Sequence, residues 1–259
     1  MVGERVGSTE AAWHSHFSTA PAFAHLRPWL SQLDLKDWPD LASLNDFARA
    51  QDLHTASGLP LRFVTQSSHC GQLEYERSIY ASGGVPSRER NWHDLFNALT
   101  WLAFPATKAA LNALHQDTLR AGDNRLPASD AATLFDESGL VLVGQVTELA
   151  ACLMRRDWHA ALVERREIWA GIGVYVIGHA VLEKLIRPWP GITAKCLCVE
   201  LPPDASLAQI DVTIAQRWQQ NPPPPMQRFP LPVLGIPGWW PANQDPVFYA
   251  DTRYFRAPR

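Results

Sequence analysis

Apolar positions recur at helical spacing along much of the chain. The clearest example follows Asn91, a good N-cap residue, where Leu95, Leu99 and Leu102 form an apolar stripe. Pro105 interrupts this stretch because proline has no backbone N–H to donate inside a helix, so we expect two helices there. In all, the pattern predicts helices over residues 21–27, 39–49, 92–103, 106–120, 147–154, 157–169, 179–187 and 205–219.

Fewer segments have the pattern of a strand. Alternating, β-branched or aromatic residues predict strands over 59–65, 73–80 and 194–201. Residues 83–86 read as a glycine-rich loop, and residues 134–143 as a hairpin that turns at 137–139. Residues 172–178 are compatible with a strand or a helix, and the helical segment that follows them favours a helix.

The C-terminal segment, residues 222–259, combines many prolines with large aromatic side chains. This much apolar surface is unfavourable in water, so we expect an ordered, extended strap lying over the protein. Either Trp239 or Trp240, or both, should be largely buried.

These patterns predict an α+β fold, in one predominantly helical domain with a small mixed or antiparallel sheet and the C-terminal strap. We expect the domain to span 1–259, with N-terminal helices over 1–58, an α+β core over 59–221 and the strap over 222–259. A chain of 259 residues buries enough apolar surface to need no metal or disulfide for stability.

Composition narrows the possible partners. The net charge of -3 argues against nucleic acid, because gripping phosphates normally requires a basic surface. There is no run of 18 apolar residues and no apolar signal segment, so we expect no membrane partner and a cytoplasmic location. The four cysteines form no CxxC pair; Cys196 and Cys198 share one strand face and are interpreted as free thiols.

The segment from residue 75 to residue 97 has the densest set of ionisable side chains. Arg88 and Arg90 precede a predicted helix N-terminus, where backbone N–H groups already favour an anion. His93 and Asn97 are four residues apart and so share one helix face. The candidate site residues of this segment are Tyr75, Glu76, Arg88, Arg90, His93, Asp94 and Asn97. The structural alternative is that Asp94 complements the helix dipole and the arginines are solvated.

A second polar pair, His179 and Glu183, also has the four-residue spacing of a helix face. The surrounding segment is apolar, and burying such a pair without partners would be costly. The two residues either pair with each other or meet the helix that carries His93. In the second case the side chains of His93, His179 and Glu183 should lie within about 8–10 Å of one another.

Asp136 and Glu137 form a third acidic position, in the predicted hairpin turn. Adjacent acids at a turn are usually solvated turn formers, which is our interpretation; a functional role is the alternative. No GxGxxG, Walker A, GxSxG, HExxH or zinc-ribbon motif occurs. The sequence therefore indicates no particular cofactor.

One long segment is similar to a known family. Residues 84–115 resemble the hallmark segment of the bacterial domain-of-unknown-function family 3025. Shorter segments support the resemblance, at 136–139, 178–184, 235–239, 248–251 and 254–256. The resemblance implies a bacterial, cytoplasmic origin, and it implies no activity.

The residues favour two hypotheses. In the first, the protein is an enzyme, a hydrolase or transferase acting on a small anionic or polar metabolite. His93 is then the general base or a metal ligand, His179 and Glu183 orient it or share the metal, and the arginines neutralise the substrate. In the second, the protein is a binding or scaffold module, and the same residues form a buried hydrogen-bond network. An open cleft would favour the enzyme, and a sealed network the scaffold.

Overall fold

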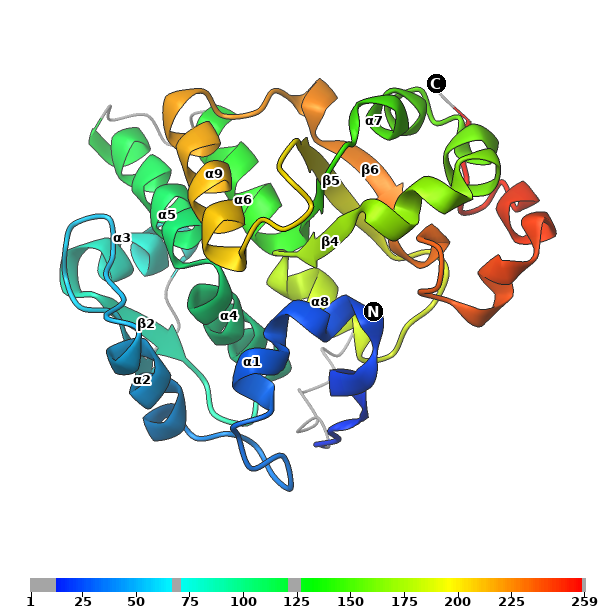
Figure 1. Ribbon diagram of the computed structural model, residues 1–259. Coiled ribbons are helices and arrows are strands. Elements are labelled where there is room, and N and C mark those ends of the chain that lie inside the picture. The colour runs from blue at the N-terminus through cyan, green and yellow to red at the C-terminus, as the bar shows by residue number, and fades with distance from the viewer. Residues whose placement is uncertain (1–12, 67–70, 121–126, 258–259) are drawn as a thin grey trace, which may run out of the picture.

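The structure, a computed structural model, describes residues 13–66, 71–120 and 127–257 (Figure 1). Its main sheet has four strands in the order β4-β3-β5-β6. These strands are β3 Gly139–Val143, β4 Gly173–Val176, β5 Thr193–Val199 and β6 Phe229–Pro232. β3 and β5 are parallel, and the other two pairings are antiparallel. The predicted α+β class with a small mixed sheet is confirmed.

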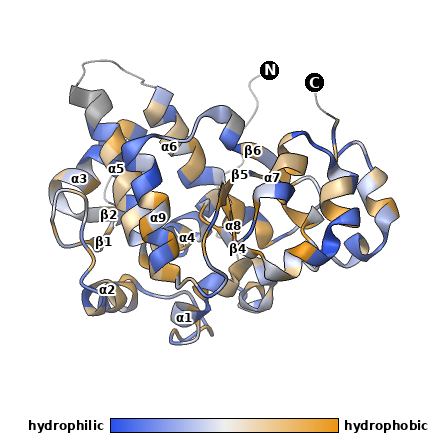
Figure 2. Ribbon diagram, turned by 45° about the horizontal axis from the view of Figure 1, so that its top comes forward, coloured by the Kyte–Doolittle hydropathy of each residue, from blue (hydrophilic) through white to orange (hydrophobic). Residues whose placement is uncertain are grey.

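Helices surround this sheet. The α-helices are α1 Arg27–Leu30, α2 Leu41–Ala50, α3 Gln72–Ser82, α4 Trp92–Ala103, α5 Pro105–Arg120, α6 Pro127–Ser138, α7 Thr147–Met154, α8 His179–Leu185 and α9 Leu207–Gln220. The 3-10 helices are η1 His16–Thr19, η2 Pro21–Leu26, η4 Arg166–Gly171, η5 Pro225–Gln227, η6 Val233–Gly235, η7 Pro241–Gln244 and η8 Pro246–Ala250, and η3 Ala160–Glu164 is a π-helix. Figure 2 shows hydrophilic and hydrophobic stretches alternating along α9, as expected for a helix with one face in water.

The helix α4 carries three of the candidate site residues, His93, Asp94 and Asn97, and a fourth, Arg90, comes just before its N-cap residue. Asn91 caps it, accepting a hydrogen bond of 3.1 Å from the backbone N–H of Asp94. Every residue of α4 except His93 is buried. α8 packs against both α4 and α6, so three helix segments far apart in the sequence converge there (Figure 1).

The strand prediction over 73–80 is wrong, because this segment forms α3. Glu76 and Ile79 are buried on one face at helical spacing, and the polar character of Glu76 hid that period from the hydrophobic pattern.

The loop prediction over 83–86 is also wrong. Gly83 ends α3 with φ 73°, and a Cβ there would lie 2.3 Å from the carbonyl oxygen of Pro60. β2, Gly84–Ser87, follows at once and pairs in parallel with β1, Arg62–Thr65.

The predicted hairpin over 134–143 is wrong as well. Its first half ends α6, whose buried residues Ala131, Ala132 and Phe135 have helical spacing, and its second half is the fully buried β3. The preference for helix over 172–178 fails because β4 pairs with β3, a long-range contact that no local pattern reveals. Asp136 and Glu137 therefore lie in the last turn of a helix.

The described part of the C-terminal strap is ordered and packed, as predicted, but it is not extended throughout, because 3-10 helices make up much of it after residue 232. Its first part is β6, which pairs with β5, and short 3-10 helices follow. The buried aromatic residues of the strap are Phe229, Tyr249 and Phe255. Trp239 and Trp240 are only partly buried, packed against the core, so these two residues are less enclosed than expected.

Two further expectations concern the thiols and the membrane. Cys152, Cys196 and Cys198 are free thiols, and Cys70 lies outside the described residues. Within the described ranges, every helix is too short or too polar to span a bilayer.

Candidate functional site

A cleft of about 400 Å³ opens where α3, α4, α6 and α8 meet. Most of its lining residues are polar. Many of them come from the segments that the sequence singled out, including Tyr75, Glu76, Arg88, His93 and His179. About a third of the His93 side chain is exposed, whereas His179 is buried. The cleft therefore connects solvent to a group of titratable side chains.

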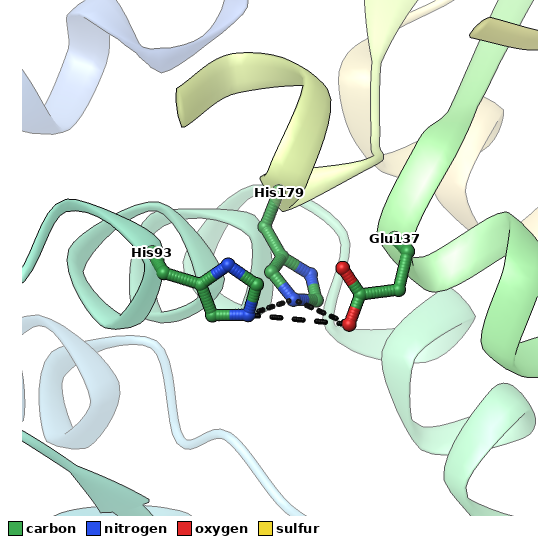
Figure 3. Close-up of side chains that lie close together, drawn as sticks. All are labelled: His93, Glu137 and His179. Atoms are coloured by element: carbon green, nitrogen blue, oxygen red, sulfur yellow. Dashed lines mark hydrogen bonds and ion pairs between the residues drawn. The ribbon is translucent and has the colours of Figure 1, made fainter. Parts of the chain in front are cut away.

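Three side chains from three helices converge at one point of the cleft wall (Figure 3). The Nε2 atoms of His93 and His179 are 3.0 Å apart. Glu137 Oε1 lies 3.5 Å from the Nε2 atom of His179 and 3.9 Å from that of His93. His93 is in the first turn of α4, His179 begins α8 and Glu137 is in the last turn of α6. We call these three residues the His–His–Glu centre.

A carboxylate lies behind each histidine. Glu183 Oε2 is 3.1 Å from the Nδ1 atom of His93 and accepts its hydrogen bond when Nδ1 carries the proton. Asp136 Oδ2 is 3.7 Å from the Nδ1 atom of His179, a buried nitrogen without a hydrogen bond to the described residues. Each imidazole thus has Nδ1 on the side of an acid and Nε2 on the side of the centre, and a hydrogen bond from Nδ1 holds the ring of His93 alone.

A network of hydrogen bonds, most of it buried, connects Asp136 to the neighbouring helices. Lys108 Nζ donates to Asp136 and, over 2.7 Å, to Asn97 Oδ1. Asn97 in turn donates to the Tyr75 hydroxyl at 2.9 Å. Only 4% of the Lys108 side chain is exposed, so its charge depends on these partners.

The two arginines differ in position. The Arg88 guanidinium lines the cleft and makes two hydrogen bonds to Asp94, of 2.8 and 2.9 Å. The Arg90 guanidinium instead donates to Asp37 at 2.7 Å, outside the cleft lining. The structure therefore brings Arg88 to the site and places Arg90 elsewhere.

A model of the family described as "Protein of unknown function (DUF3025)" matches residues 61–259. The chain belongs to this family. No curated protein and no solved structure matches the chain. All cleft residues fall inside the matched segment, so the cleft belongs to the DUF3025 part of the chain.

The titratable side chains of the DUF3025 cleft shift one another's pKa values. Burial acts to lower the pKa of His93, but its hydrogen bond to Glu183 and the charge of Glu137 outweigh burial and raise it. Burial acts to raise the pKa of Asp136, but Lys108 and His179 lower it below its usual value. The pKa of Glu137 is likewise lowered, against burial, chiefly by His179.

Glu76 is the exception among these acids. It lies on the cleft lining with its side chain buried, and Asn112 Nδ2 donates to its carboxylate at 2.6 Å. Burial, and then the charge of Asp136, raise its pKa to about 7. Glu76 therefore carries a proton over much of the acidic and neutral range.

The expected meeting of His93, His179 and Glu183 is confirmed as geometry: His93 contacts both other side chains. The structure also brings Tyr75, Glu76, Asp94 and Asn97 to the same cleft. Asp136 and Glu137, which the sequence pattern places in a turn, end α6 and line the cleft, and the pattern gives no role to Lys108, which contacts Asp136. A signal for Lys108 exists, since it is the one cation in the mostly small and apolar first part of α5, residues 105–114.

Proposed function

We propose that the protein is an enzyme, a hydrolase or transferase, that acts on a small polar substrate bound in the cleft. The observation that carries this proposal is the convergence of the His–His–Glu centre on an open cleft of about 400 Å³. A cleft of this size suits a metabolite, and convergent polar groups with perturbed pKa values are typical of reaction sites.

The chemistry of the centre follows from His93. Its pKa is raised by acids on both sides, and an imidazole that titrates near neutral pH can take or give a proton during reaction. His93 is also the centre residue with a third of its side chain in the cleft. His93 is therefore proposed to carry the reaction, as the general base or as a metal ligand, and Glu183 holds its ring in place through Nδ1.

A scaffold function is the second candidate, and one observation favours it. Arg88 is fixed on Asp94 by two hydrogen bonds, so it is not held ready for an anionic substrate. For the same reason, a neutral polar substrate fits the enzyme hypothesis better than an anion. The open cleft supports the enzyme proposal, because a purely structural network has no need of contact with solvent.

The enzyme hypothesis predicts that His93→Ala and His179→Ala each reduce turnover by at least about 100-fold, since positioned acid–base groups contribute on that order or more. The measurement is a panel of phosphate-ester, carboxylate-ester and amide substrates, with the full chain purified without chelators. His159→Ala is the matched control, because His159 is an exposed histidine paired with Glu164 on the surface. Turnover unchanged in both centre variants, or no turnover on any substrate, would favour the scaffold.

A further inference from the structure

We propose that the His–His–Glu centre binds one divalent transition-metal ion, through His93 Nε2, His179 Nε2 and Glu137 Oε1. The use of this ion in catalysis rests on the proposed function, whereas its binding does not. The three atoms belong to side chains whose donor atoms all lie within 4.8 Å of one another. Imidazole nitrogen and carboxylate oxygen are ligands that zinc and its neighbours in the first transition row accept.

The distances fit such an ion with small adjustments. A tetrahedral ion with bonds of about 2.0–2.2 Å holds its ligand atoms about 3.3–3.6 Å apart. The observed separations are 3.0 Å between the two nitrogens, and 3.5 and 3.9 Å from these nitrogens to Glu137. Each differs from that range by less than roughly 0.5 Å, which side-chain rotation alone can supply.

The groups behind the histidines set the direction of their lone pairs. A histidine that donates Nδ1–H to a carboxylate leaves Nε2 as a lone pair, the arrangement that outer-layer acids give to metal-binding histidines. Glu183 does this for His93. The Nδ1 atom of His179 lies 3.7 Å from Asp136 and makes no hydrogen bond to the described residues, so Asp136 favours a proton on this nitrogen through its charge alone. With both Nδ1 atoms protonated, two lone pairs and a carboxylate oxygen face one another, an arrangement that a cation between them stabilises.

The charge balance of the cleft points to the same kind of ion. The cation that lines the cleft, Arg88, is already paired with Asp94, and the buried Lys108 beside the cleft is paired with Asp136. Among the described residues, Glu137 and Glu183 form ion pairs with histidines alone. With neutral histidines, these two carboxylates leave a charge that one divalent cation balances.

An ion at this point would keep coordination positions open to the cleft. Three protein ligands with a free position are the arrangement of catalytic rather than structural zinc sites. Such an ion lowers the pKa of a bound water to about 7. This water would release its proton to solvent, its oxygen would bond to the electrophilic atom of the substrate, and the bond to the leaving group would break as that group takes up a proton. This would make the proposed enzyme a hydrolase.

The test measures binding before activity. The full chain is stripped with a chelator, and Zn²⁺, Mn²⁺ and Co²⁺ are titrated by calorimetry, with absorption spectra of the Co²⁺ form. We expect one equivalent of metal and a cobalt spectrum of nitrogen and oxygen ligation. His179→Ala and Glu137→Gln should weaken binding more than about 100-fold, and Glu183→Gln, which acts through His93, by about 10–100-fold.

Two controls keep the result interpretable. His159→Ala removes an exposed His–Glu pair of similar separation, 3.2 Å, and should leave the affinity unchanged. Glu137→Gln keeps the shape of the side chain, so it tests the ligand set even if His179→Ala fails to fold. Less than a tenth of an equivalent of bound metal in the wild type, or equal metal affinity in the wild type and in Glu137→Gln, would contradict the proposed metal site. A proton would then be the cation shared by the three side chains. Metal binding without turnover on any substrate would instead support the site and contradict the proposed function.

Discussion

Lys108→Met should lower the free energy of unfolding by about 3–5 kcal/mol, the usual cost of leaving one partner of a buried ion pair alone. Lys108 Nζ is the cation that Asp136 contacts, and it also bonds to Asn97 at 2.7 Å. Methionine keeps most of the side-chain volume, so the loss is mainly electrostatic. Burial of Asp136 would then raise its pKa, since Lys108 is the main group that lowers it. Denaturant unfolding at pH 7 measures the effect.

Two variants separate this effect from a general loss of charge. Lys184→Met removes an exposed lysine on α8 and should change stability by no more than about 0.5 kcal/mol. The double variant Lys108→Met with Asp136→Asn should recover part of the loss, because no unpaired buried charge remains. A double variant less stable than Lys108→Met alone would show that the pair is not the reason for burying Lys108.

Local signals were enough to predict the elements that carry the histidines. Asn91 and Pro105 mark the ends of α4 by their own backbone chemistry, and the leucine stripe defines its buried face. The four-residue spacing of His179 and Glu183 was likewise readable, because α8 is a regular helix. These features depend on residues within one or two helical turns.

The rest depended on contacts between distant segments. α3 buries Glu76, so its hydrophobic pattern lacks the residue that would have shown its helical period. β4 is a strand because β3 lies beside it, and Glu137 is a candidate ligand because α6 ends against α8. A single sequence contains no direct record of such neighbours, which is why Asp136 and Glu137 were interpreted as turn residues.

The same burial that concealed Glu76 makes it a source of pH-dependent instability. Three charged or titratable groups act on its carboxyl group: Asp136 raises its pKa, and Lys108 and His179 lower it. Asn112 supplies a hydrogen bond to it in the folded state. The folded protein therefore holds a proton on Glu76 that the unfolded chain releases at lower pH.

Glu76→Gln should raise the free energy of unfolding at pH 8 by up to roughly 3 kcal/mol and leave it nearly unchanged at pH 4. The pKa of Glu76 is about 7 in the folded protein against an ordinary 4.5. Below pH 4.5 both states are protonated, so the group costs nothing; between 4.5 and 7 the unfolded chain loses its proton first and stability falls. Above 7 the cost is complete, at about 1.4 kcal/mol per pKa unit. Glutamine avoids the cost and still accepts the Asn112 hydrogen bond. Denaturant unfolding between pH 4 and 8 measures the difference in free energy of unfolding between variant and wild type. Glu74→Gln is the control: Glu74 is an exposed acid on α3, so the difference for this variant should not change with pH. A Glu76→Gln difference independent of pH would mean that the pKa of Glu76 is the same in the folded protein and in the unfolded chain.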